Sequence, residues 1–347
     1  MEFLTEYGLF LAKAVTIVVS ILLVLSAIAS LAIKEKKGEE GHLEVRNLNE
    51  HLKRMRTVLQ EGTLEKEKLK ALAKLEKQEA KKARKKHSHE PNLDEKKTAY
   101  VIEFNGDIKA SQNHGLRESI SAVLSIAKPE DEVVIKIESG GGMVHSYGLA
   151  SAQLDRIKKK GIPLTVCVDK VAASGGYMMA CVADKIIASP FAVLGSIGVV
   201  AQIPNVHNLL KKNDIEFEVL TAGEHKRTMT IFGENTEKGR QKFMEDLEDT
   251  HVLFKQFVGE HRPVVNMEEV ANGDVWFGRR ALEVKLVDEL MTSDEYLHQL
   301  CDTANVFEVK YATKKTLPER MGLAASLGIE NAITGWISSA NKARFWS

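Results

Sequence analysis

Hydrophobic and polar positions divide this chain of 347 residues into three stretches with different patterns. Residues 14–33 contain no charged side chain, and a helix of that length spans roughly 30 Å, the thickness of a bilayer core. Residues 38–94 are dominated by Lys, Glu, Ala and Leu, with apolar side chains at helical spacing. From residue 98 onward, segments rich in β-forming residues alternate with segments of helical period. The pattern predicts a transmembrane helix, a charged helical spacer and an α/β domain, in that order.

The N-terminal apolar run is interpreted as an uncleaved membrane anchor. A cleaved signal peptide is the alternative, since Ala27 and Ala29 form an A-x-A-like cleavage site. The run exceeds the usual ~7–15 apolar residues of a signal peptide, and Lys13 is the one basic residue before it. Lys34 and Lys36 follow the run, and the positive-inside rule then favours a cytoplasmic position for the rest of the chain.

Strands and helices alternate in the third stretch, which predicts parallel βα units. Strands are expected at residues 98–104, 132–139, 163–169 and 184–190, and helices at residues 116–127 and 145–160. The predicted organisation is an anchor at 1–33, a charged helical spacer at 34–97, a globular domain at 98–305, and a C-terminal strand with an amphipathic tail at 306–347.

Composition argues against several classes of partner and site. The 48 basic and 48 acidic residues give a formal net charge of zero, so nothing indicates nucleic acid as a partner. The three cysteines, Cys167, Cys181 and Cys301, form no C-x-x-C pair, which argues against a disulfide framework. His87 and His89 lie in a charged segment and are interpreted as solvated, so no metal is expected.

Two glycine-rich turns follow predicted strands, where open α/β sheets place their functional sites. The first turn contains Ser139 and glycines 140–142, and the second contains Ser174 and Gly175. Small neighbours leave the Ser174 hydroxyl reachable, and the N–H groups of Gly141 and Gly175 are expected to hold an oxyanion beside it. The alternative is that Ser174 is an ordinary helix N-cap, because serine is favoured at that position.

A serine nucleophile requires a base. The histidines of the domain have no recognisable carboxylate partner in the sequence, which leaves lysine as the candidate. Lys226 precedes the partly apolar residues 228–232, and burial of a lysine disfavours its charged form. Ser174 and Lys226 are therefore the candidate nucleophile and general base of a Ser-Lys dyad. From its local sequence alone, Lys226 is better interpreted as a surface loop lysine.

Five segments together resemble the signal peptide peptidase/protease IV family of membrane serine peptidases, and in particular its SohB-type members. They are ESGGGMV at 138–144, VAASGGYMMACVADKI at 171–186, GSIGVV at 195–200, TAGEHKRTMTIFGENTEKGR at 221–240 and FGRRALEVKLVDEL at 277–290. The resemblance extends from about residue 98 to residue 294, and the ordered set is far more specific than any one segment.

The resemblance implies a crotonase-like ββα superhelix related to the caseinolytic protease subunit. It implies that Ser174 is the nucleophile, Lys226 the base and Gly141 an oxyanion donor. Hydrophobic peptides, including signal-peptide-like or membrane-derived ones, are the implied substrates, and neither cofactor nor ATP is required. Single-length relatives form dome-like rings that share the dyad between subunits, so a homo-oligomeric ring is expected. The anchor is expected to lie in the bacterial inner membrane.

Two positions depart from the family pattern. Gly140 stands where relatives often have proline, which loosens the turn, and Lys285 stands where many relatives have glycine. The family's catalytic domain is usually drawn outside the cytoplasm, opposite to the positive-inside expectation, so the sequence leaves the side of the membrane open.

Two other functions are weighed against the peptidase. An acyl-CoA enzyme of the crotonase fold needs an oxyanion hole but no Ser-Lys dyad, and the presence of both Ser174 and the Lys226 segment argues against it. A non-catalytic membrane scaffold is the second alternative, and it has no need of a reachable serine.

Overall fold

The computed structural model describes residues 7–13, 15–20, 41–65, 67–71, 74, 78 and 96–313. The chain divides into two compact units, one of residues 43–312 and one of residues 1–42 with 313–347. In the second unit, residues 7–13 and 15–20 are helical. Among the described residues, no helix is long and apolar enough to cross a membrane. The predicted anchor lies mostly outside them, as does the amphipathic tail, so both stay predictions.

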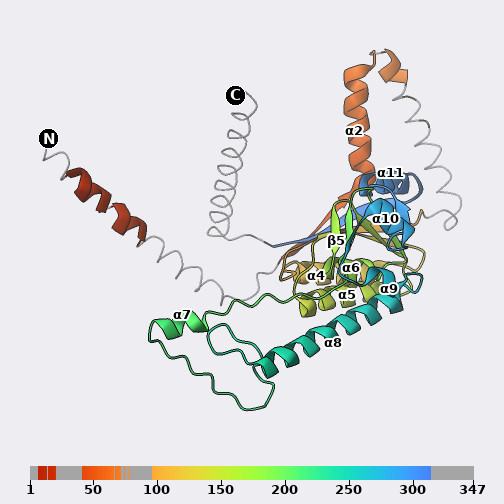
Figure 1. Ribbon diagram of the computed structural model, residues 1–347. Coiled ribbons are helices and arrows are strands. Elements are labelled where there is room, and N and C mark those ends of the chain that lie inside the picture. The colour runs from red at the N-terminus through yellow and green to blue at the C-terminus, as the bar shows by residue number, and fades with distance from the viewer. Residues whose placement is uncertain are drawn as a thin grey trace, which may run out of the picture. The chain divides into compact units, whose positions relative to one another are not determined.

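A ten-stranded, mostly parallel sheet forms the centre of the unit 43–312 (Figure 1). Its main path runs β1-β10-β2-β3-β4-β6-β9, while β5 pairs with β3 and leads to β7 and β8. The strands are β1 (His42–Asn47), β2 (Thr98–Gly106), β3 (Glu132–Ser139), β4 (Leu164–Val168), β5 (Val171–Ala173), β6 (Lys185–Ala188), β7 (Val193–Gly195), β8 (Val275–Phe277), β9 (Glu289–Leu290) and β10 (Asn305–Ala312). The predicted α/β class with parallel strand pairing is confirmed.

Helices cover both faces of this sheet. The helices of this unit are α2 (Leu48–Thr63), α4 (Asn113–Ile126), α5 (Val144–Lys159), α6 (Gly175–Ala180), α7 (His207–Lys212), α8 (Glu237–His261), α9 (Met267–Val270), α10 (Gly278–Glu283) and α11 (Ser293–Thr303), of which α7 lies away from the sheet (Figure 1). Successive side chains of β2 point to opposite faces. Ile102 and Phe104 therefore join the large core cluster with residues of α4, α5 and α6, whereas Val101 packs in a smaller cluster with Leu297 and Leu300 of α11.

The spacer departs from its predicted helical structure at the start. Residues His42–Asn47 form β1, a strand at the edge of the sheet next to β10. Leu43 and Val45 alternate with polar residues there, which suits a strand, but the helix-forming residues around them obscured this short pattern. The helix α2 follows as predicted, and the Asn47 side chain caps it by accepting a hydrogen bond from the Glu50 N–H at 2.9 Å.

An extended arm, residues 196–236, leaves the sheet after β7 and includes α7 (Figure 1). Several of its apolar side chains are exposed, among them Val200 at 82% and Leu220 at 83%. The rings of Phe217 and Phe232 contact each other with centroids 5.2 Å apart. The long helix α8 then leads the chain back to the sheet, so the arm is a loop attached at both ends to the folded core.

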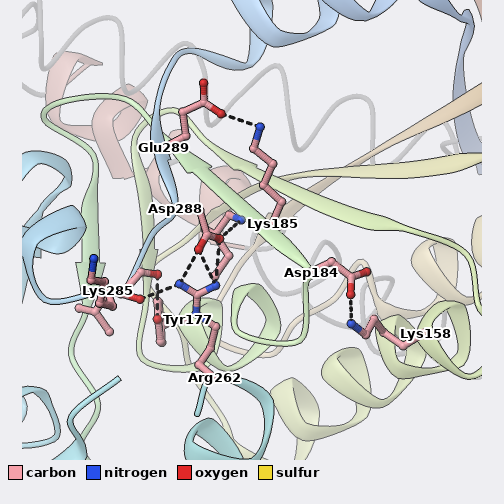
Figure 2. Close-up of polar contacts among 10 residues, drawn as sticks. Lys158, Tyr177, Asp184, Lys185, Arg262, Lys285, Asp288 and Glu289 are labelled. Carbon is pink, nitrogen blue, oxygen red and sulfur yellow. Dashed lines mark hydrogen bonds and ion pairs between the residues drawn. The ribbon is translucent and has the colours of Figure 1, made fainter. Parts of the chain in front are cut away.

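A buried arginine fixes the end of α8 to the turn before β9 (Figure 2). Arg262 is 4% exposed, and its guanidinium donates hydrogen bonds to both carboxylate oxygens of Asp288 and to the Lys285 carbonyl. Asp288 also accepts the Ile186 N–H, at 2.7 Å, from β6. This clamp matters for the site because the middle of α8 forms one wall of the cavity described next.

Candidate active site

Ser174 lies at the turn between β5 and α6, in a backbone conformation that few residues adopt. Its φ is +51° and its ψ is −120°, which is strained for a residue with a Cβ. The N–H donates to the Gly195 carbonyl at 2.8 Å, and the carbonyl accepts from the Met178 N–H at 2.9 Å. These bonds hold the strained turn between β7 and the first turn of α6.

The Ser174 side chain does not act as a helix cap. Although Ser174 precedes α6, its hydroxyl makes no capping hydrogen bond to the described first turn of that helix. The side chain is half-buried and borders a cavity. The ordinary N-cap interpretation therefore does not account for this serine, and its hydroxyl stays available to a bound molecule.

The two predicted glycine turns meet at Ser174. Ser139, the last residue of β3, is paired with Ala172 of β5, which brings the carboxyl ends of these strands side by side. Gly141 has φ +87°, and a Cβ added to it would lie 2.6 Å from the Gly175 nitrogen and 2.7 Å from the Ser174 Cβ. A side chain at Gly141 is thus excluded by both conformation and space. The structure brings Gly141, Ser174 and Gly175 together, as the sequence predicts.

The two predicted oxyanion donors differ in their surroundings. Gly175 is the first residue of α6, where backbone N–H groups have no partner within the helix. The Gly141 N–H instead donates to the buried Ser139 hydroxyl at 3.1 Å. In this arrangement the Gly141 N–H already has an acceptor. Its hydrogen bond to Ser139 must break before the N–H can donate fully to an oxyanion.

A cavity of about 280 Å³ opens beside Ser174. Its walls are glycines and mostly apolar side chains, contributed by the first glycine turn, by α5 and α6, by residues 198–200 and by α8. Met178, Phe254 and Phe257 are the largest apolar side chains among them. Such a cavity accepts an apolar side chain of a ligand rather than a charged one.

Lys226 is not part of this cavity. It lies on the arm, its side chain is exposed, and its N–H donates to the Gly223 carbonyl at 3.2 Å. The apolar setting expected for Lys226 from the sequence is therefore not formed by the described residues of a single chain. Of the described side chains that border the cavity, none is Lys, His, Asp or Glu.

His261 has a carboxylate partner that lies far from it in the sequence. His261 lies 3.3 Å from Asp155, and its other ring nitrogen contacts the Phe257 carbonyl at 2.8 Å. The pair joins α8 to α5, and neither residue borders the cavity. It is interpreted as a structural contact. In the part of the chain with described coordinates, no cluster of three or more His, Cys, Asp or Glu residues suits a metal ion.

Sequence reasoning missed the residues that shape the site around Ser174. Tyr147 of α5 is fully buried, and a Cβ on Gly175 would lie 2.4 Å from its ring. Phe254 and Phe257 come from α8, about 80 residues after the serine. Helical period marks such residues as core-facing, but it does not show which of them border a cavity.

Comparison with known proteins shows the class. The chain matches the model described as Peptidase family S49 N-terminal over residues 2–154 and that of Peptidase family S49 over residues 156–307. A relative named "Probable protease SohB" from Haemophilus influenzae is 50% identical over 96% of both chains. Another of that name, from Buchnera aphidicola, is 47% identical over 86% of this chain and 99% of its own. "Protease 4" of Haemophilus influenzae is 25% identical over 57% of this chain and 34% of its own length.

These matches define the protein as a peptidase. The chain belongs to peptidase family S49, which confirms the resemblance found in its sequence.

Proposed function

We propose that this peptidase is a serine endopeptidase whose nucleophile is Ser174. The observation that supports this most directly is the state of the Ser174 hydroxyl. It belongs to a residue with strained backbone, it does not cap α6 in the described structure, and it borders an apolar cavity. Strain of this kind, about 1–3 kcal/mol, persists where it serves a functional geometry.

In the proposed reaction, the Ser174 oxygen attacks the carbonyl carbon of a peptide bond while its proton passes to a base. The C–N bond breaks as the base returns that proton to the leaving amine, and the acyl group stays on Ser174. Water, deprotonated by the same base, then attacks the acyl carbon; the bond to the Ser174 oxygen breaks, the base returns its proton to that oxygen, and the acyl group leaves as a carboxylic acid. The N–H groups of Gly175 and Gly141 stabilise the oxyanion at each step.

The proposed base is Lys226, supplied by a neighbouring copy in a ring. Two observations support a neighbour. The described walls of the cavity contain no lysine, histidine or carboxylate, and Lys226 lies on an arm with exposed apolar residues such as Leu209 and Leu220. Apolar surface of this kind is typical of protein interfaces. Contact with a neighbour would remove water from the lysine, and desolvation favours the neutral amine that a base requires.

The cavity walls support hydrophobic peptides as substrates, since Met178, Phe254 and Phe257 offer apolar contacts beside Ser174. Signal-peptide-like and membrane-derived segments have this character. In this proposal, residues 14–33 anchor the enzyme in the bacterial inner membrane. Residues 98–305 form the peptidase domain as a crotonase-like ββα superhelix, and no cofactor takes part.

A fluorophosphonate probe tests the nucleophile, because it reacts with activated serines. The full-length protein in detergent should be labelled, and Ser174→Ala should lose the label together with at least about a thousandfold of peptide hydrolysis. Ser196→Ala is the matched control, since Ser196 is also half-buried and has a positive φ of 50°. It should label as the wild type does. Labelling that survives in Ser174→Ala would show that another residue is the nucleophile.

A further inference from the structure

Two buried hydroxyl groups lie beneath the first glycine turn, and the proposed reaction does not use them. Ser139 is 2% exposed and Tyr147 is fully buried. Their oxygens are 2.6 Å apart, the Tyr147 oxygen lies 2.8 Å from the Asp107 carbonyl, and the Ser139 oxygen lies 3.1 Å from the Gly141 nitrogen. These contacts form one continuous chain from the glycine turn to the loop after β2.

The direction of the hydrogen bonds follows from the ends of this chain. A carbonyl oxygen can only accept, so Tyr147 donates its one hydrogen to Asp107. Ser139 then donates to Tyr147 at 2.6 Å, a shorter contact than the 3.3 Å to the Gly106 carbonyl, and its lone pair accepts the Gly141 N–H. Burial raises the pKa of Tyr147, so its hydroxyl keeps its hydrogen at neutral pH. The two hydroxyls in the middle are each both donor and acceptor, which strengthens such chains cooperatively.

The surroundings allow the turn to move while they hold the two hydroxyls in place. A Cβ on Gly106 would lie 2.4 Å from both hydroxyl oxygens, and a Cβ on Gly175 would lie 2.4 Å from the Tyr147 ring. Tyr147 is therefore tightly enclosed. A Cβ on Gly140, in contrast, would have no atom within 4 Å. Both residues of the Gly140–Gly141 peptide thus have the conformational freedom of glycine, and Gly140 has open space on the side where a Cβ would stand.

We propose that Ser139 and Tyr147 are positioning residues that hold the Gly141 N–H in a resting position, from which the peptide rotates to serve the oxyanion. The inference rests on the proposed function of Ser174 and Gly141. In the resting position one of two donors is engaged by Ser139. Part of the stabilisation of the transition state is then offset by the loss of the bond to Ser139. Removal of the Ser139 acceptor should therefore accelerate attack at Ser174.

The test compares Ser139→Ala and Ser139→Cys with the wild-type full-length protein in detergent. The rate constant of fluorophosphonate labelling should rise about fivefold in Ser139→Ala, the equivalent of a hydrogen bond of ~1 kcal/mol. The labelling rate constant of Ser139→Cys should rise nearly as much, since a thiol is similar in size to a hydroxyl but is a weak acceptor. Ser151→Ala is the matched control. Its hydroxyl is also buried in α5 and bonds the Tyr147 carbonyl at 2.9 Å, but it does not touch the turn.

Hydrogen exchange of the Gly141 amide gives a second readout that requires no activity. It should be faster in both Ser139 variants than in the wild type and in Ser151→Ala. Equal or slower labelling in both Ser139 variants overturns the proposal, and so does a wild-type rate in Ser139→Cys, which would assign the effect to packing. If even the wild type is not labelled at Ser174, the proposed function fails, and amide exchange alone then decides whether Ser139 holds the turn.

Discussion

The Arg262 guanidinium meets both carboxylate oxygens of Asp288, at distances of 2.9 to 3.1 Å, and so joins the end of α8 to the turn before β9 (Figure 2). Because α8 contributes Phe254 and Phe257 to the cavity beside Ser174, this contact positions one wall of the site from a distance. Arg262 is nearly fully buried, which makes the contact far more sensitive to substitution than the exposed ion pairs drawn beside it.

Arg262→Ala should lower the free energy of unfolding by about 2 kcal/mol, since it leaves the Lys285 carbonyl and Asp288 without their buried donor, while the Asp288 side chain is 36% exposed. Lys158→Ala is the control, because Lys158 pairs with Asp184 at a partly exposed position and such pairs contribute about 1 kcal/mol or less. Denaturant unfolding of the two variants measures the difference. Equal losses would contradict the assignment of Arg262 as the stronger link.

Lys285→Gly should stabilise the fold by about 1 kcal/mol. Lys285 has φ +65° at the end of α10, a conformation that costs a residue with a Cβ about 1–2 kcal/mol and glycine nothing. Its backbone carbonyl, which accepts from Arg262, is kept in the variant. Lys285→Ala should bring no such gain, because alanine retains the Cβ. Thermal unfolding compares the three proteins. An equally large gain in stability in the alanine variant would show that relief of backbone strain is not the cause.

Cys167 should resist alkylation in the native protein. It is 1% exposed, and burial raises its pKa to about 12, so at pH 8 only about one molecule in ten thousand has the reactive thiolate. A raised thiol pKa reduces the thiolate fraction, and therefore the rate of alkylation, at every pH below that pKa. Half-buried Cys301 should react first, and Cys167 only after unfolding. Mass spectrometry of maleimide-treated protein identifies the order, and prompt native labelling of Cys167 would contradict this prediction.

Local patterns in the sequence were sufficient for the central sheet. Residues 132–139 are predicted as a strand and form β3 with the same bounds, because a short segment rich in Val and Ile before a glycine turn favours a strand over a helix. The meeting of Gly141 with Ser174 was also predictable, since parallel strands bring their carboxyl ends to one edge.

Contacts between distant segments were not predictable. The bond of the Gly141 N–H to Ser139 depends on the rotation of one peptide, which residue type does not fix. The placement of Phe254 in the cavity depends on how α8 packs, and that in turn depends on Arg262 and its partner 26 residues later. The exposure of Lys226 follows from the course of the arm, for which the sequence has no periodic signal.

If Lys226 of one subunit serves Ser174 of its neighbour, two inactive variants should restore activity when mixed. Ser174→Ala supplies an intact lysine and Lys226→Ala an intact serine, so some interfaces in a mixed ring contain a complete dyad. With random exchange at equal amounts, about a quarter of the interfaces are complete, and about a quarter of wild-type peptide hydrolysis is expected.

The control mixes Ser174→Ala with the double variant Ser174→Ala/Lys226→Ala, which has no intact serine and should stay inactive. Subunit exchange must be shown separately, for example by energy transfer between labelled copies. Proven mixed rings without recovered hydrolysis would mean that serine and base belong to one chain. In that case the arm would have to fold back over its own cavity, against the exposed position that Lys226 has in this structure.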